Sequence, residues 1–194
     1  MGSFWDTCSE TYLKKFEYKR GEPSRKYIIE ALKNGDTLLE CGIGNGDVLD
    51  MVNEAGIDID YTGLDCTNAF VDHVRKKHPQ ANLDVGDMQD LGKFSDDEFT
   101  IAYTRHTLEH LPYYDKALRE LARVSKERVI FILFHPLEEN DRIIIKSKEY
   151  NLYNNYYGRK NFTKLIEELF DTASVTVVKS AKGGMDEVIM DCKL

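Results

Sequence analysis

The sequence predicts an α/β protein with a doubly wound, mostly parallel sheet of seven strands and a C-terminal antiparallel hairpin. Short apolar runs alternate along the chain with segments in which apolar residues recur every three or four positions, as in strands followed by helices. A glycine-rich turn follows the first of these strands, where parallel folds bring backbone close to a ligand. Two short β-branched runs flank a Lys-Gly-Gly turn near the C-terminus and indicate the hairpin.

The first 35 residues are expected to form cap helices over 9–20 and 24–32, because each range carries an apolar stripe at helical spacing. Asn34-Gly35 then ends the second helix. These two helices lead directly into the first strand of the predicted sheet.

Strands are predicted next at 37–41, 61–64, 82–85, 99–103 and 129–134. Helices are predicted between them at 48–55, 68–77 and 114–124. Beyond the fifth strand, the pattern indicates an insertion at 136–160, a helix at 161–170 and hairpin strands at 175–178 and 188–192. Because strands alternate with helices, we expect helices on both faces of the sheet and one domain over residues 1–194.

The turn after the first strand carries the first candidate site. Glu40 and Cys41 end the strand, and Gly42, Gly44 and Gly46 follow at alternate positions. A dinucleotide-binding loop would have the spacing G-x-G-x-x-G, and a P-loop would continue with Lys-Ser/Thr. An acid at the strand tip instead suits a cationic or hydroxyl-bearing ligand. The alternative is a turn with a purely structural role.

Two further acids stand at strand tips. Asp65 ends the second strand, at the position that binds ribose hydroxyls in nucleotide-binding folds, although it could also cap a helix. Asp87 follows the third strand and can accept a hydrogen bond from an exocyclic amino group. Met88 beside it can pack on a base or belong to the core.

Three histidines follow the fourth and fifth strands. His106 and His135 lie at the tips of these two strands, and His110 lies one helical turn beyond His106. A histidine supplies a base with a pKa near physiological pH, so His106 and His135 are candidate catalytic residues, with structural roles as the alternative. Glu109 could join His106 and His110 in a metal site, but their spacing places the three side chains unevenly, and we expect no metal.

Composition limits the classes of protein to which this chain can belong. The net charge of −8 argues against nucleic acid, which needs a basic surface. The four cysteines are scattered, so we expect reduced thiols in a reducing compartment, and hence a cytoplasmic protein. We find no apolar run of membrane-spanning length and no signal peptide.

Four stretches in this order resemble the class I S-adenosylmethionine-dependent methyltransferases, of the small subfamily called type 11. They are Leu39 to Gly46, Gly63-Leu64-Asp65, Gly86-Asp87-Met88, and His106 to Leu111 with the helix that follows. The resemblance covers about residues 36 to 135, and it implies a Rossmann-like methyltransferase fold. The chain departs from the family at Ser125-Lys126-Glu127-Arg128, where the family usually has a Lys-Pro-Gly-Gly turn.

The resemblance implies that the chain binds S-adenosylmethionine. The glycine turn would lie along the methionine and ribose, with Glu40 near the amino acid part and Asp65 on the ribose hydroxyls. Cys66 and Asp87-Met88 would flank the adenine. Thr104 would contact the methionine end. The implied cofactor-binding residues are therefore Glu40, Gly42, Gly44, Asn45, Gly46, Asp65, Cys66, Asp87, Met88 and Thr104.

The resulting hypothesis is a methyltransferase that acts on a small molecule or sugar, most simply at oxygen. The strand-tip histidines favour an enzyme, and the absence of an Asn/Asp-Pro-Pro-Tyr/Phe motif disfavours nucleic-acid amino groups. A non-catalytic cofactor-binding regulatory module and an enzyme acting on protein side chains remain alternatives. The insertion and the N-terminal aromatics Phe4, Trp5 and Tyr12 form either a substrate lid or a structural excursion. The pattern does not indicate an oligomeric state.

Overall fold

The computed structural model describes residue 13 and residues 23–148, 152–179 and 186–194. The main sheet contains β1 (Thr37–Cys41), β2 (Asp60–Asp65), β3 (Asn82–Val85), β4 (Phe99–Arg105), β5 (Ser125–Leu133), β8 (Thr172–Val178) and β9 (Glu187–Lys193). The helices are α2 (Pro23–Ala31), α3 (Asp47–Ala55), α4 (Asn68–Lys77), α5 (Asp115–Val124) and α6 (Arg159–Leu169), with a short 3₁₀ helix η1 (Leu108–His110).

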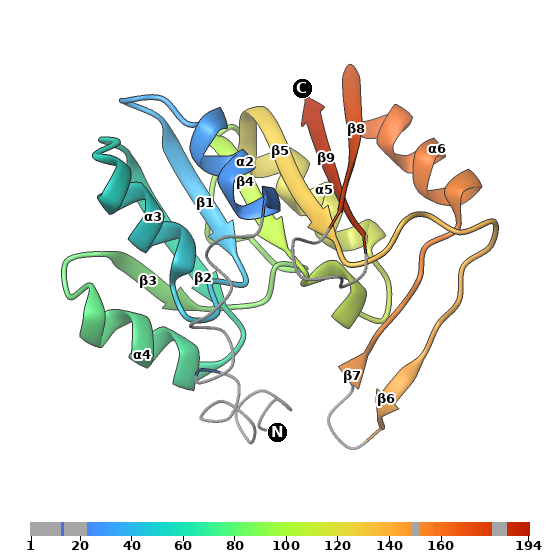
Figure 1. Ribbon diagram of the computed structural model, residues 1–194, viewed down its shortest axis with the longest axis horizontal. Helices are drawn as coiled ribbons and strands as arrows, with labels where there is room; N and C mark the ends of the chain where they lie inside the picture. The colour runs from blue at the N-terminus through green and yellow to red at the C-terminus, as the bar shows by residue number, and fades with distance from the viewer. Residues whose placement is uncertain (1–12, 14–22, 149–151, 180–185) are drawn as a thin grey trace.

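The strand order is β3-β2-β1-β4-β5-β9-β8 (Figure 1). Strands β1 to β5 run parallel, and β9 runs antiparallel to both β5 and β8. The order reverses between β1 and β4, and ligands of open α/β sheets bind beyond the carboxyl ends of the strands at such a reversal. The predicted fold class is therefore confirmed, including the terminal hairpin.

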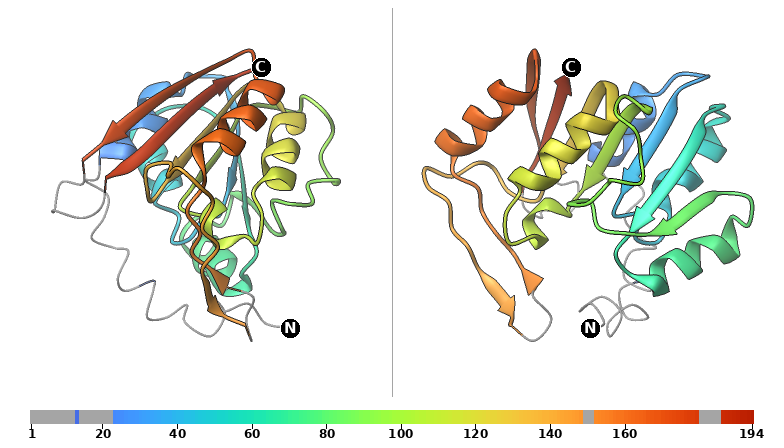
Figure 2. Two further views of the ribbon diagram at one scale, coloured as in Figure 1. Left: turned by 90° about the vertical axis from the view of Figure 1, so that its right-hand side faces the viewer. Right: turned by 180° about the vertical axis from the view of Figure 1, so that it is seen from behind.

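Helices cover both faces of the sheet, as the doubly wound fold requires (Figure 2). On one face, Ile28 of α2, Leu49 of α3 and Val71 of α4 belong to one buried cluster with the sheet. On the other face, Leu118 of α5 and Phe162 of α6 belong to a second cluster. Alternate residues of each strand enter opposite clusters, because successive strand side chains point to opposite faces. The candidate site lies at the carboxyl edge of the sheet, between these two layers of helices.

Most predicted bounds agree with the structure to within two residues, but β5 starts earlier than predicted. The range Ser125–Arg128, expected as a turn, forms the first part of the strand directly after α5. Its pairing with β4 contains an irregularity between Phe99 and Ile101. This range holds neither glycine nor proline to interrupt the backbone pairing, so the extra residue is accommodated as a bulge.

The insertion contains a two-stranded hairpin that the sequence did not reveal. Its strands are β6 (Ile145–Ser147) and β7 (Leu152–Tyr153), which pair antiparallel. The hairpin projects beyond the carboxyl ends of the parallel strands (Figure 1). It therefore stands on the side of the sheet where a ligand would bind.

Several predictions concern residues outside the described ranges. The first cap helix, the aromatics Phe4, Trp5 and Tyr12, and the Lys-Gly-Gly turn of the hairpin all fall there. Of the described cysteines, Cys41, Cys66 and Cys192 are free thiols. Within the described ranges, we find no helix whose length and apolar character suit a membrane span.

Candidate functional site

The glycine turn is hydrogen-bonded to the end of β2. The backbone N–H of Gly42 donates to the Leu64 carbonyl at 2.7 Å. Gly42 and Gly44 adopt φ angles of 84° and 52°, in the left-handed region that favours glycine. A Cβ built on Gly44 would meet no atom of the described residues within 4 Å, so this part of the fold leaves the backbone open there. The turn thus presents exposed backbone at the carboxyl edge and leads into the N-terminus of α3.

Gly42 also lies directly against the segment that follows β4. A Cβ on Gly42 would overlap the Thr107 hydroxyl and come within 3.2 Å of its Cγ2. The hydroxyl is held in place because it donates to the Arg105 carbonyl at 3.1 Å. The first strand-tip turn and the residues after His106 are therefore packed together, which brings two parts of the predicted site into contact.

Asp65 supports the glycine turn from the tip of β2. Its carboxylate accepts from the backbone N–H of Gly44 at 3.1 Å and from that of Thr67 at 2.9 Å. Its side chain is buried, with 7% exposure. Asp65 is therefore packed inside the protein, with both carboxylate oxygens engaged by backbone N–H groups. Asp65 therefore fixes the shape of the glycine turn through hydrogen bonds to the backbone.

Glu40 is buried beside the turn, and Tyr61 donates a hydrogen bond of 2.5 Å to its carboxyl group. Burial raises the pKa of Glu40 to about 8, although the Tyr61 hydroxyl and the nearby Arg25 guanidinium oppose this shift. Arg25 itself forms a buried ion pair of 2.5 Å with Asp47 at the start of α3. A cationic ligand beside Glu40 would favour the ionised carboxylate by simple charge attraction.

The tip of β4 carries a cluster that the sequence analysis identified only in part. Arg105 donates to Glu187 of β9 at 2.6 Å, and the His106 Nε2 atom lies 2.8 Å from the same oxygen. The contact of His106 lacks the alignment of an ideal hydrogen bond. The sequence analysis did not identify Glu187 and Arg105 as site residues. The signal for Glu187 was its place at the start of the last strand, because an antiparallel last strand must begin at the carboxyl edge of its parallel neighbour.

His106 is a neutral imidazole at physiological pH. Burial lowers the pKa of its ring, and this outweighs the opposite effect of the Glu187 carboxylate. The ring packs on Phe134 at the end of β5, with 4.2 Å between centroids. His106 is thus an unprotonated base held at the carboxyl edge.

His135 follows Phe134 and lies beneath the insertion. Its ring stacks on Tyr156 with centroids 4.0 Å apart, and the Arg142 guanidinium covers the other face of Tyr156 at 3.9 Å. Its Nε2 atom is buried and has no hydrogen-bond partner among the described residues. Burial lowers the pKa of His135, so this ring is also neutral at physiological pH. An unpartnered buried ring nitrogen is a candidate contact for a polar ligand.

Three predicted cofactor contacts differ in their surroundings. Cys66 and Asp87 are exposed near the carboxyl edge. Met88 is 4% exposed and belongs to the core cluster, which favours the core role over contact with a base. The Thr104 hydroxyl is buried and donates to the Cys41 carbonyl at 2.8 Å. It joins β4 to β1 inside the sheet, so the expected contact of Thr104 with the methionine end is not supported.

The histidine and glutamate of the conceivable metal site face different partners. Glu109 accepts from the Phe134 backbone N–H, and its other carboxyl oxygen is buried with no hydrogen-bond partner in the described part of the chain. Burial raises the pKa of Glu109 to about 8, against the opposing backbone hydrogen bonds. His110 contacts the Tyr153 carbonyl at 2.8 Å. Across the described ranges, no three His, Cys, Asp or Glu side chains are grouped to hold a metal ion.

Two cavities of the described structure lie away from the glycine turn. One, of about 640 Å³, lies between residues 137–139 and α6. The other, of about 470 Å³, lies between the insertion, the start of α5 and α6. Both are lined by residues of the insertion or its neighbours. We place the candidate site by its chemistry at the carboxyl edge, because the buried charges and the glycine turn meet there.

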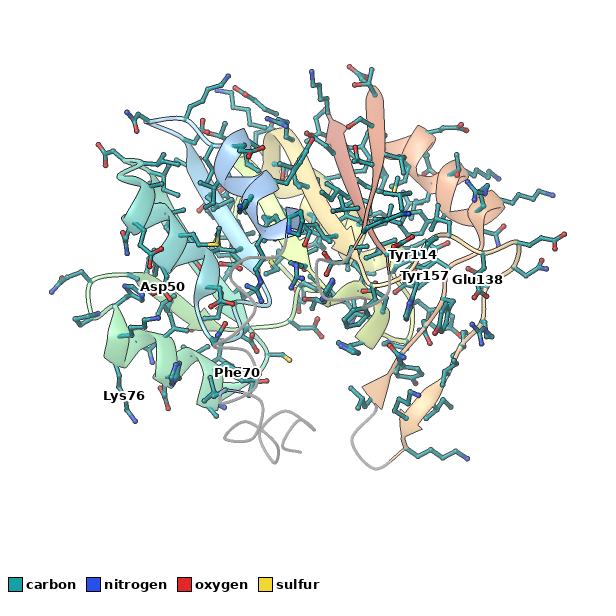
Figure 3. All side chains as sticks on the ribbon, viewed as in Figure 1. Asp50, Phe70, Lys76, Tyr114, Glu138 and Tyr157 are labelled. Atoms are coloured by element: carbon teal, nitrogen blue, oxygen red, sulfur yellow. The ribbon has the colours of Figure 1, made fainter. Side chains whose placement is uncertain are left out.

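The second arm of the insertion is anchored along η1. Asn155 is buried, its backbone N–H donates to the Glu109 carbonyl at 2.9 Å, and its side chain donates to the Leu111 carbonyl at 2.8 Å. Tyr157 donates to the Leu108 carbonyl and packs against Tyr114, with centroids 4.5 Å apart (Figure 3). This arm is therefore part of the fold, while Tyr156 faces the histidine at the tip of β5.

These contacts separate the roles of the two tyrosines. Tyr157→Ala should destabilise the protein by about 3–5 kcal/mol, as for other large buried side chains. Tyr156→Ala should cost only about 0.5–1.5 kcal/mol, the value of one aromatic stack, and should spare cofactor affinity. Thermal unfolding of both variants measures this, with a melting temperature lowered by about 10 °C for the first. Equal losses of stability would show that both tyrosines are core residues.

Comparisons with known proteins bear on this geometry. The family model described as methyltransferase domain matches residues 39–133. No curated protein matches the chain by sequence. A chain of the Haloferax volcanii complex between the Trm112 methyltransferase activator and a methyltransferase has a TM-score of 0.75 at 15% identity, over 97% of this chain and 95% of that chain.

Two further solved structures are similar. One is the Burkholderia thailandensis 1,6-didemethyltoxoflavin-N1-methyltransferase with bound 1,6-didemethyltoxoflavin and S-adenosylhomocysteine, with a TM-score of 0.70 at 13% identity over 95% of this chain and 81% of that chain. The other is an S-adenosylmethionine-dependent methyltransferase from Aquifex aeolicus, with a TM-score of 0.65 at 19% identity over 94% and 97%. At these identities the likeness establishes the fold. With the family match over residues 39–133, it confirms the resemblance to class I S-adenosylmethionine-dependent methyltransferases.

Proposed function

We propose that this chain is an enzyme that transfers a methyl group from S-adenosylmethionine to an oxygen atom of a small molecule or sugar. The observation that carries the proposal is the neutral His106 ring, which lies at the carboxyl edge within one residue of the contact between Thr107 and the glycine turn. A base and a cofactor-binding backbone are thereby joined at the edge where α/β folds bind their ligands.

The residues present fit this cofactor. The turn has open backbone at Gly44, and Asp65 and Glu40 place two carboxyl groups beside it. Carboxylates suit hydroxyl and ammonium groups, and they do not suit phosphates. Family neighbours crystallised with S-adenosylhomocysteine support the same cofactor. In this proposal, Asp65 binds the ribose hydroxyls and Glu40 lies near the amino acid part.

The chain's own contribution to the reaction is alignment and removal of a proton. S-adenosylmethionine supplies a methyl group on a sulfonium, which passes in line to a nucleophile. Holding the nucleophile in line with the methyl group lowers the activation barrier substantially, because the loss of translational and rotational entropy has already occurred on binding. A hydroxyl oxygen becomes strongly acidic as it acquires the methyl group, so a weak base such as buried His106 is sufficient to accept its proton. His135, with its unpartnered Nε2 atom, orients the acceptor from the β5 side.

A second candidate is a cofactor-binding module that regulates a partner, or an enzyme whose activity depends on one. The observation that favours it is the Haloferax neighbour, which is found in a complex with a methyltransferase activator. Both functions require the same cofactor site, and only turnover separates them. Methylation of protein side chains is the remaining alternative, and a basic peptide as acceptor would indicate it.

The first experiment is calorimetric titration of the full chain with S-adenosylhomocysteine. We expect micromolar affinity, which corresponds to about −8 kcal/mol. Incubation with tritiated S-adenosylmethionine and separate pools of phenols, sugars, carboxylic acids and basic peptides then assigns the acceptor class. The absence of both heat and thermal shift at millimolar cofactor would refute the proposal. Binding without transfer to any pool would favour the regulatory module.

A further inference from the structure

We propose that Glu187 is a positioning residue, which fixes the orientation and the protonated nitrogen of the His106 ring. This inference rests on the proposed function, because His106 is the base of that proposal. Glu187 contacts the ring at Nε2 and is not proposed to touch the acceptor. Its role is to leave the other ring nitrogen with its lone pair available.

The sheet topology brings Glu187 to the site. Because β9 runs antiparallel, its first residue arrives at the carboxyl edge of the parallel strands. Arg105 pairs with Ile132 of β5, and Ile132 pairs with Ile189 of β9. Glu187 is two residues before Ile189 and therefore shares its face of the sheet. Arg105 and Glu187 are 82 positions apart in sequence, yet they face each other across one strand.

The backbone of His106 turns its ring to the same carboxylate. A residue that follows Arg105 in a regular strand would point to the opposite face. His106 instead has a φ angle of 55°, in the left-handed region that non-glycine residues rarely adopt. Its backbone N–H still donates to the Ile132 carbonyl at 2.9 Å, so the turn occurs while the pairing with β5 is kept. Arg105 and His106 thus converge on one oxygen of Glu187.

The charges around Glu187 keep it ionised. Burial alone would raise the pKa of its carboxyl group, but His106 and the Arg105 guanidinium outweigh burial and lower it. Ser24 of α2 accepts from the Arg105 Nε atom at 3.3 Å, and the Arg25 guanidinium acts on the His106 ring from the same helix. The Glu187 oxygen lies 2.8 Å from Nε2 without the alignment of an ideal hydrogen bond, and its negative charge still favours the tautomer with the hydrogen on that nitrogen. Nδ1 is then the nitrogen that accepts a proton.

The test reads the His106 ring directly and requires no acceptor. Long-range ¹H–¹⁵N spectra of the labelled full chain report which ring nitrogen carries hydrogen, and His106→Asn assigns the signal. In the parent we expect a slowly exchanging Nε2–H proton with a downfield shift. Glu187→Gln should lose this signal or move it upfield, because the neutral amide removes the negative charge 2.8 Å from Nε2 that favours the hydrogen on that nitrogen. Glu187→Asp should retain part of the parent signal.

Asp191→Asn is the matched control. Asp191 is on the same strand and the same face, and it also pairs with an arginine, but its partners are Arg128 and Tyr27 at the other end of β9. This variant should leave the His106 signals unchanged. If Glu187→Gln does not fold because Arg105 loses its counter-charge, the double variant Arg105→Gln/Glu187→Gln removes both charges and allows the same measurement.

The two hypotheses fail in different ways. If the parent does not bind S-adenosylhomocysteine by calorimetry, the proposed function fails whatever the ring spectra show. If it does bind and the His106 signals are the same in Glu187→Gln as in the parent, Glu187 is only the counter-charge of Arg105 and the inference is overturned. Loss of the Nε2–H signal in Glu187→Gln, with no change in Asp191→Asn, supports it.

Discussion

Replacing Gly42 with alanine is expected to destabilise the protein by about 2–5 kcal/mol. An L-residue in the left-handed region costs about 1–2 kcal/mol, and overpacking against a fixed neighbour costs about 1–3 kcal/mol more. Both apply here, because the new methyl group would overlap the Thr107 hydroxyl at a φ of 84°. Thermal unfolding measures the loss, and titration with S-adenosylhomocysteine should show that cofactor affinity falls with it.

Gly44→Ala is the matched control for this prediction. It imposes a similar backbone strain, with φ at 52°, but its methyl group would meet no atom within 4 Å across the described ranges. We expect a cost of about 1–2 kcal/mol only. The double variant Gly42→Ala/Thr107→Ala removes the overlapping atoms and should recover part of the stability that Gly42→Ala loses. Equal effects of Gly42→Ala and Gly44→Ala would show that the contact between the two turns is unimportant.

Asp65→Asn should weaken binding of S-adenosylhomocysteine by on the order of 10- to 150-fold, because a charged hydrogen bond contributes about 1.5–3 kcal/mol. A carboxylate accepts from both ribose hydroxyls, whereas an amide places an NH₂ donor at one of these positions. The structure adds a cost in stability, since the same carboxylate accepts from the backbone N–H groups of Gly44 and Thr67. We expect the protein to be destabilised by about 1–3 kcal/mol, because the NH₂ group of the asparagine would face one of these two backbone N–H donors.

Asp60→Asn provides the control for Asp65. Asp60 begins the same strand at its opposite end, and its side chain is exposed. This variant should bind S-adenosylhomocysteine like the parent and unfold at the same temperature. An Asp65→Asn protein that is destabilised yet binds like the parent would show that Asp65 supports the turn without contacting the ribose.

Local pattern was sufficient for much of the fold. The bounds of β1, α4 and β3 agree residue for residue with those predicted, because buried strands and amphipathic helices repeat their apolar positions at fixed periods. The start of β5 was wrong, since its first residues are polar and resemble a turn. The hairpin β6–β7 was missed because its strands are too short to show a period.

The sequence by itself determined the fold class, the glycine turn, the strand-tip acids and the histidines at the ends of β4 and β5. These features are local, so the order of residue types along the chain is enough to predict them. Only the tertiary structure decided which side chains meet. Met88 belongs to the core and Thr104 joins two strands, although the resemblance implied a cofactor contact for both. Glu187 reaches His106 because strand order and register, which are set by distant pairings, bring the last strand to the carboxyl edge.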